Sequence, residues 1–228
     1  MLLKEWDKIP AVLQNDAVLE YYDLLKNKTG NLIIKRVFDI LFSLLFIVVF
    51  SPIFLIIGIA VAVSSGFPII YKQSRVTQYN KEFKVFKFRT MVKNADKRGS
   101  LVTVDNDSRI TKIGSFLRRY RLDELPQIFN VLGGSMTLVG TRPEVREYVD
   151  DYTDEMMATL LLPAGITSLA SIEFKDEAQM LKDADNVHEE YVKNILPLKM
   201  RFNLEYIKKF SFLYDLSLLF KTLTAVIK

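Results

Sequence analysis

The stretch ILFSLLFIVVFSPIFLIIGIAVAV, residues 40–63, contains no charged side chain and decides how the rest of the chain is organised. As a helix, about 24 apolar residues are long enough to reach across the hydrocarbon core of a bilayer. About 30 residues of mixed charge precede it and no small-residue cleavage pattern follows, which excludes a cleavable signal peptide. The alternative is a buried core helix, but few domains of this size can cover a helix that is apolar all round. We therefore predict a membrane segment.

Ser51 and Pro52 divide this segment into two arms of about 11 residues, each about 16 Å long as a helix. Proline removes a backbone donor and clashes with the preceding turn, so a kink is expected at this position. The Ser51 hydroxyl can bond a freed carbonyl, which makes the break tolerable in lipid. We predict that the membrane segment bends at Ser51-Pro52.

Basic residues flank the segment on both sides, with Lys35 and Arg36 before it and Lys72 and Arg75 after it. Basic flanks are typical of the cytoplasmic side of a membrane segment. A straight span violates this rule at one end, whereas a re-entrant hairpin that enters, bends and leaves on the same face satisfies it at both. The charges favour the hairpin, and the simple span stays open.

The amino-acid composition excludes several classes of function. The 228 residues allow one ordinary domain plus an appendage. The excess of 31 Lys and Arg over 27 Asp and Glu is too small to indicate nucleic-acid binding. The chain has no Cys and one His, which excludes disulfides, thiol catalysis and a zinc site of the usual ligands.

Beyond Gly66 the pattern becomes that of a small domain with short elements. Alternation in FPIIYKQ and KEFKVFKFRTM predicts two strands, and TKIGSFLRRY and DELPQIFNVL predict short helices. KNADKRGSLVTVDNDSRI, residues 93–110, is polar and predicts an irregular loop. The predicted fold class is α/β, mostly α, with three parts: an N-terminal helical extension (1–31), the membrane helix (32–65) and a catalytic domain (66–228).

The last helix, residues 210–228, is amphipathic. We assign one face to Phe212, Leu213, Leu216, Leu219, Phe220, Leu223, Val226 and Ile227, and the opposite face to Ser211, Asp215, Ser217, Lys221, Thr222 and Lys228. The apolar face can lie in the headgroup region of a membrane or pack on the domain core. The sequence does not decide between these two placements.

The residues of a phosphate site gather around RYRLDEL, where Asp123 and Glu124 follow Arg118, Arg119 and Arg121. Neighbouring acids repel each other, so we expect a metal ion or an arginine-bound phosphate between them. Nearby arginines and a helix N-terminus should lower both pKa values and keep both carboxylates ionised. An ionised aspartate suits covalent catalysis at phosphorus, and a glutamate beside it suits Mg²⁺. The alternative is an exposed helix cap with a surface ion-pair cluster.

Several motifs in a fixed order resemble one family: KRVFDILFSLLFIVVFSPIFLI, FKVFKFRTM, RITKIGSFLRRYRLDELPQIFNVLGGSMTLVGTRPEV and YVKN. Over residues 33–228 the chain resembles the bacterial sugar transferases, the monotopic phosphoglycosyl transferases. The resemblance implies transfer of sugar-1-phosphate from a UDP-sugar to undecaprenyl phosphate, with release of UMP. It implies a re-entrant hairpin bent at Ser51-Pro52, on the cytoplasmic face of the bacterial inner membrane, with Lys35 and Arg36 anchored to lipid headgroups.

The resemblance also implies roles for single residues. Asp123 is expected to attack the phosphate bonded to the sugar and to form a covalent phosphosugar-aspartate, and Glu124 is expected to hold Mg²⁺ together with Asp123. Basic and amide side chains at motif positions are expected to bind substrate phosphates: Gln73, Arg75, Lys87, Arg89, Arg118 and Arg142. Interfacial helices of the family often support self-association.

Two departures from the family pattern stand out. PAGITS, residues 163–168, lacks an arginine that members often carry there, and Gly is missing after the Gln-x-Arg of residues 73–75. About 30 residues before the membrane segment leave no space for the extra spanning helices of larger members, which is typical of the minimal form. Two other functions stay open: a UDP-releasing membrane glycosyltransferase, and a non-catalytic scaffold of polysaccharide assembly.

Overall fold

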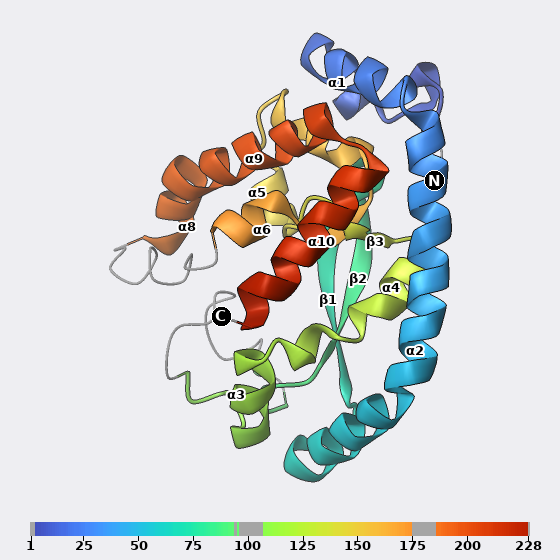
Figure 1. Ribbon diagram of the computed structural model, residues 1–228. Helices are drawn as coiled ribbons and strands as arrows, with labels where there is room; N and C mark the ends of the chain where they lie inside the picture. Colours follow the sequence, from blue (N-terminus) through green and yellow to red (C-terminus); the bar gives the residue numbers. More distant parts are fainter. Residues whose placement is uncertain (1–2, 94, 96–106, 175–185, 228) are drawn as a thin grey trace.

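One helix, α2 (Thr29–Ser65), runs along one side of the other elements (Figure 1). The computed structural model describes residues 3–93, 95, 107–174 and 186–227. Pro52 lies inside this 37-residue helix, and the Ser51 hydroxyl donates to the Val48 carbonyl at 2.9 Å. Figure 1 shows α2 changing direction in its C-terminal half, which contains Pro52. The predicted helix and its bend are present, whereas the return to one face of a membrane stays a prediction.

The sides of α2 differ in exposure. Leu32, Lys35, Asp39 and Ser43 are buried, and their spacing of three or four residues defines a row along one side of the helix. Only 11% of the most apolar 18-residue window of α2 is buried. Within the described residues, α2 is the one helix long and apolar enough to cross a membrane. The alternative of a buried core helix is therefore wrong.

The two predicted strands form an antiparallel hairpin of β1 (Ile70–Thr77) and β2 (Lys81–Phe88), joined by the turn η3 (Gln78–Asn80). The register pairs Gln73 with Val85, Arg75 with Phe83 and Tyr71 with Lys87. Because opposed residues of an antiparallel pair share a face, Gln73, Arg75 and Lys87 lie on the same face of the hairpin.

The segment that carries the paired acids consists of three short elements. They are α3 (Lys112–Arg119), the 3-10 turn η5 (Leu122–Glu124) and α4 (Gln127–Gly133). Between α3 and η5, Arg121 adopts a left-handed conformation with φ of 56°, which sharply redirects the chain before the acids. At Gly114 a Cβ would lie 1.9 Å from the Thr90 carbonyl oxygen, so α3 packs directly on the chain after β2.

The remainder places helices around a short parallel pair of strands, β3 (Met136–Val139) and β4 (Ala164–Thr167). Two short helical elements connect β3 to β4: α5 (Arg146–Val149) and the 3-10 helix η6 (Met156–Leu161). The chain continues through α6 (Leu169–Glu173), α8 (Val187–Glu190), the π-helix η7 (Tyr191–Ile195), α9 (Leu196–Lys209) and α10 (Phe212–Ile227). Most of the predicted polar loop 93–110 lies outside the described residues.

Helix α10 packs on the domain through the face that carries Asp215. Asp215 and Leu218 are 4% and 0% exposed, and Thr222 bonds Thr167 of β4. Part of the predicted apolar face points outward, with Leu213 76% and Phe220 69% exposed, whereas Leu219 packs against the core. A buried ion pair turns Asp215 of the predicted polar face inward, whereas Lys221 of the same face is exposed.

Lys35 supplies that ion pair, which corrects its expected role as a headgroup anchor. Its ammonium, 2% exposed as a side chain, donates to Asp215 Oδ2 at 2.5 Å and to the Val139 carbonyl at 2.7 Å. The Tyr206 hydroxyl donates to the other oxygen of Asp215. Arg36 donates to the carbonyls of residues 131 and 132 at the end of α4. Both cations hold α2 to the domain.

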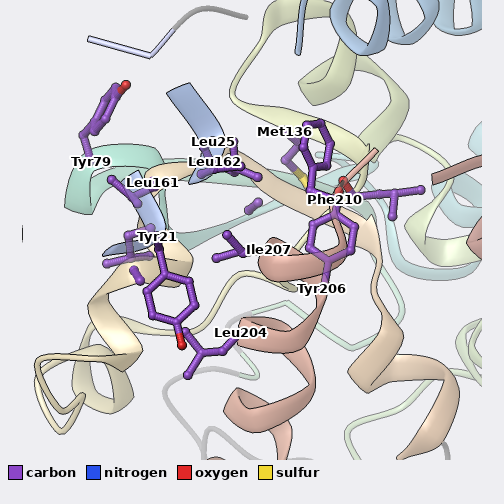
Figure 2. Packing of buried hydrophobic residues seen from close by; sticks show 14 of the residues in the cluster. Tyr21, Leu25, Tyr79, Met136, Leu161, Leu162, Leu204, Tyr206, Ile207 and Phe210 are labelled. Carbon is purple, nitrogen blue, oxygen red and sulfur yellow. Dashed lines mark hydrogen bonds between the residues drawn. The ribbon is translucent and has the colours of Figure 1, made fainter. Parts of the chain in front are cut away.

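The N-terminal helix α1 (Asp16–Lys26) belongs to the main hydrophobic core. Figure 2 shows Tyr21 and Leu25 of α1 beside Leu161, Leu162 and Ile207, from later elements. The Tyr21 hydroxyl also donates to Glu155 at 2.5 Å. Helix α1 therefore shares a core with the predicted catalytic domain.

Candidate active site

Asp123 occupies the middle of η5 and is 8% exposed. Among the described residues, none donates a hydrogen bond to its carboxylate or lies within ion-pair distance. Burial raises the pKa of Asp123, and the charge of Glu124 raises it further, against the opposing effect of Lys87, Arg118 and Arg121. The expectation of a lowered pKa is wrong for this residue, because desolvation outweighs the cations.

Glu124 is held by two cations. Lys87 Nζ lies 3.0 Å from Oε1, and Arg142 donates to Oε1 at 2.9 Å and to Oε2 at 3.1 Å. Burial alone would raise the pKa of Glu124, but these charge-assisted bonds lower it well below its ordinary value. The expected lowering is confirmed here. Lys87 and Arg142, two of the predicted phosphate ligands, thus meet beside Asp123.

Arg118 reaches the site from the last turn of α3. Its Nε donates to the Thr90 hydroxyl at 2.9 Å, and this bond fixes the guanidinium on the chain that follows β2. Burial lowers the pKa of Arg118, while Asp123 and Asp107 oppose that effect. The side chain is half-buried, and its charge interacts with that of Asp123.

The main chain around Arg142 is fixed by the β3–β4 pair. Gly140 donates to the Thr167 carbonyl at 2.9 Å, Gly165 donates to the Thr141 carbonyl at 2.8 Å, and Arg142 itself donates to the Ile166 carbonyl at 3.0 Å. A Cβ on Gly165 would lie 2.3 Å from Gly140 backbone atoms, so only glycine fits. PAGITS therefore holds Arg142 through backbone atoms, which do not depend on the arginine that this segment lacks.

The other predicted phosphate ligands are placed differently. Arg89 is 8% exposed and donates to the carbonyls of Ser65 and Pro68, at the junction of α2 and β1. Arg75 donates to the Pro143 carbonyl at 3.3 Å and lies 3.7 Å from Glu144. Gln73 is half-buried on the same face of the hairpin as Lys87. Their assignment to substrate stays a prediction.

Two contributors were not predicted from the sequence: Thr90, which holds Arg118, and Glu144, which binds Arg75. Thr90 lies in the strand motif that carries Lys87, and Glu144 follows Arg142 and Pro143. Their positions next to predicted ligands are the only sequence signal. Their roles depend on partners 28 and 69 residues away along the chain.

Comparison with known proteins identifies the family of this chain. The family model described as bacterial sugar transferase matches residues 30–228. The chain belongs to the bacterial sugar transferase family. The match includes every element that builds the site and also α2, which confirms the resemblance found in the motifs.

Three curated relatives whose names include undecaprenyl phosphate are similar to this bacterial sugar transferase. It is 34% identical over 90% of its length to the UDP-N-acetylgalactosamine-undecaprenyl-phosphate N-acetylgalactosaminephosphotransferase of Aeromonas hydrophila, covering 48% of that protein. It is 34% identical over 96% of its length to the UDP-glucose:undecaprenyl-phosphate glucose-1-phosphate transferase of Escherichia coli, covering 44%. The undecaprenyl-phosphate galactose phosphotransferase of Salmonella typhimurium is 32% identical over 88% of the chain, covering 42% of the relative. The chain spans about half the length of these relatives.

Proposed function

We propose that this protein is a phosphoglycosyl transferase that moves sugar-1-phosphate from a UDP-sugar to undecaprenyl phosphate and releases UMP. The observation that carries the proposal is the state of Asp123, a buried carboxylate that the described residues leave without a hydrogen bond, next to a glutamate held by Lys87 and Arg142. A carboxylate that accepts no hydrogen bond from the described residues keeps its oxygens available to a ligand, and titratable groups with shifted pKa values gather at functional sites. The names of the relatives support the donor and acceptor classes.

In the proposed reaction, a carboxylate oxygen of Asp123 attacks the phosphorus bonded to the sugar, and the bond from that phosphorus to UMP breaks. Lys87, Arg118 and Arg142 neutralise the phosphate oxygens, where charge develops during the transfer. An oxygen of undecaprenyl phosphate then attacks the phosphosugar-aspartate and displaces the carboxylate. The product is a lipid-linked diphosphosugar, and Asp123 returns to its first state.

The residues also fit the predicted Mg²⁺, chiefly through Asp123. Mg²⁺ commonly binds one or two carboxylates together with substrate phosphates and keeps several waters. The carboxylate of Asp123 is available, whereas both oxygens of Glu124 accept bonds from cations. When bound, the ion would neutralise diphosphate charge. Glu124 becomes a second ligand only if Lys87 or Arg142 moves from it to a substrate phosphate.

We further propose that the enzyme lies on one face of the inner membrane, with α2 as a re-entrant hairpin. Supporting this are the exposed apolar side of α2 and the outward apolar face of α10, where Leu213, Phe220 and Leu223 are 60–76% exposed. Large exposed apolar patches mark interaction or membrane surfaces. This placement would bring the long lipid acceptor to the site from the bilayer.

The test is nucleotide release by membranes or liposomes that contain the protein, given a panel of UDP-sugars, undecaprenyl phosphate and Mg²⁺. We expect UMP from the proposed reaction, whereas UDP would indicate the rival glycosyltransferase and no nucleotide at all would indicate a scaffold. When the sugar phosphate of the UDP-sugar is radiolabelled, wild-type protein should become covalently labelled before the acceptor is added. Asp123→Asn should abolish both label and UMP, and turnover by this variant would refute the assignment of the nucleophile.

A further inference from the structure

A second cluster of charged side chains is buried behind Arg142, centred on Glu144. Glu144 Oε1 accepts a hydrogen bond from the Tyr191 hydroxyl at 2.6 Å and another from Lys199 Nζ at 3.1 Å. Lys199 also donates to the Tyr191 oxygen at 2.7 Å, and Arg75 lies 3.7 Å from Glu144 Oε2. None of these side chains takes part in the proposed reaction. Because burying charged groups costs free energy, the cluster calls for another role.

The π-helix η7 accounts for how one helix supplies two of these groups. Tyr191 and Lys199 are eight residues apart, and in a regular α-helix eight residues advance about 80° beyond two full turns. The wider turn of a π-helix absorbs most of this excess, so that both side chains reach the same carboxylate. Single π-helical turns are rare in proteins as a whole, but those that occur are often found at functional sites.

Glu144 is joined to the site by the shortest covalent route, two residues after Arg142. Its carbonyl accepts from Val76 of β1 at 2.9 Å, and the preceding carbonyl of Pro143 accepts from Arg75. On the other side, residues 140–142 are bonded to β4. The chain on both sides of Arg142 is therefore held, by backbone bonds before it and by the charged cluster after it.

We propose that Glu144 is a positioning residue of the transferase site, whose buried carboxylate, held by Tyr191, Lys199 and Arg75, aims Arg142 at Glu124 and at the diphosphate of the donor. The proposal rests on the proposed function. It gives Arg75 a role through Glu144 in place of direct substrate contact. A displacement of about 1 Å in a group that orients substrate can cost about 100-fold in rate, so loosening this anchor should be visible in kinetics.

The experiment is a double-mutant cycle between Glu144→Gln and Arg142→Ala, in full-length protein reconstituted in liposomes. Initial rates of UMP release are measured against donor concentration and, separately, against acceptor concentration. We expect Glu144→Gln to lower kcat/KM for the UDP-sugar about tenfold and to leave KM for undecaprenyl phosphate unchanged. In the Arg142→Ala background, the same substitution should have no further effect on donor kcat/KM.

Two further variants keep the test decisive. Tyr191→Phe removes one hydroxyl and preserves the ring, so it decides the question should Glu144→Gln fail to fold. Glu189→Gln is the matched control, because Glu189 is 53% exposed and pairs with Lys193 on the adjoining turn, away from Glu144. We expect the control to behave as wild type, and amide exchange of residues 140–146 to quicken only in the Glu144 and Tyr191 variants.

The outcomes separate the inference from the function on which it rests. Absence of UMP release by the wild type would overturn the proposed function, and unchanged amide exchange in the Tyr191 variant would then also overturn the anchor. An active wild type whose Glu144 and Arg142 effects multiply independently would refute the positioning role alone. Equal losses of kcat/KM for the donor and for the acceptor would also refute the positioning role, since they would indicate general destabilisation.

Discussion

Replacement of Lys35 by Met separates two roles of this residue: membrane anchor and core ion pair. The Lys35 and Asp215 side chains are 2% and 5% exposed. Removing one partner of such a buried pair costs about 3–5 kcal/mol, because the other charge stays buried without compensation. A loss of about 4 kcal/mol corresponds to a fall in Tm of about 8–16 °C for a chain of this length.

The assay is thermal unfolding in detergent, combined with flotation on liposomes. Lys35→Met should lower Tm by that amount, while the double variant Lys35→Met with Asp215→Asn should recover most of it, because no unpaired charge remains. Lys26→Met, at an exposed lysine, serves as the control. An unchanged Tm with weaker flotation would refute this reasoning and restore the anchor role.

The pH dependence of the stability lost in Lys35→Met gives a second check. Burial raises the pKa of Asp215, and Lys35 opposes that effect. Removing Lys35 raises the pKa further, so the folded variant binds a proton more tightly than its unfolded chain does. Stability of Lys35→Met should therefore rise as the pH falls toward this raised pKa. A loss of stability that stays the same at every pH at which the protein remains folded would contradict the buried ion pair.

Three other predictions concern the membrane, α10 and the nucleophile. Cysteines placed singly at Asn27 and Phe67 should both react with an impermeant reagent from the cytoplasmic side, whereas reaction of one from outside would indicate a true span. Leu213→Ser should weaken liposome flotation with little change in Tm, whereas Leu218→Ser should destabilise the protein by about 3 kcal/mol; equal effects on Tm would contradict the orientation of α10. Arg118→Met removes a cation that lowers the raised pKa of the nucleophile, so the acidic limb of the UMP-release profile should move to higher pH, and Arg118→Lys should not move it.

The elements could be predicted from the sequence because their signals are local. The uncharged run around Pro52, the alternation of the two strands and the short helices around the acids each depend on residues close together in the chain. The observed elements agree with these expectations. The ordered motifs also identified the family and assigned Lys87, Glu124 and Arg142 to one phosphate site. The direct contacts of both cations with Glu124 were found only in the structure.

Burial, by contrast, was decided only by tertiary structure. The two faces of α10 are evident in its sequence, but Asp215 turns inward because Lys35 meets it from 180 residues earlier. The same holds for Asp123, whose neighbouring arginines predicted a lowered pKa until packing removed it from water. A local pattern shows which side chains share a face, whereas the free energy of a charge depends on the solvent and partners that distant segments leave to it.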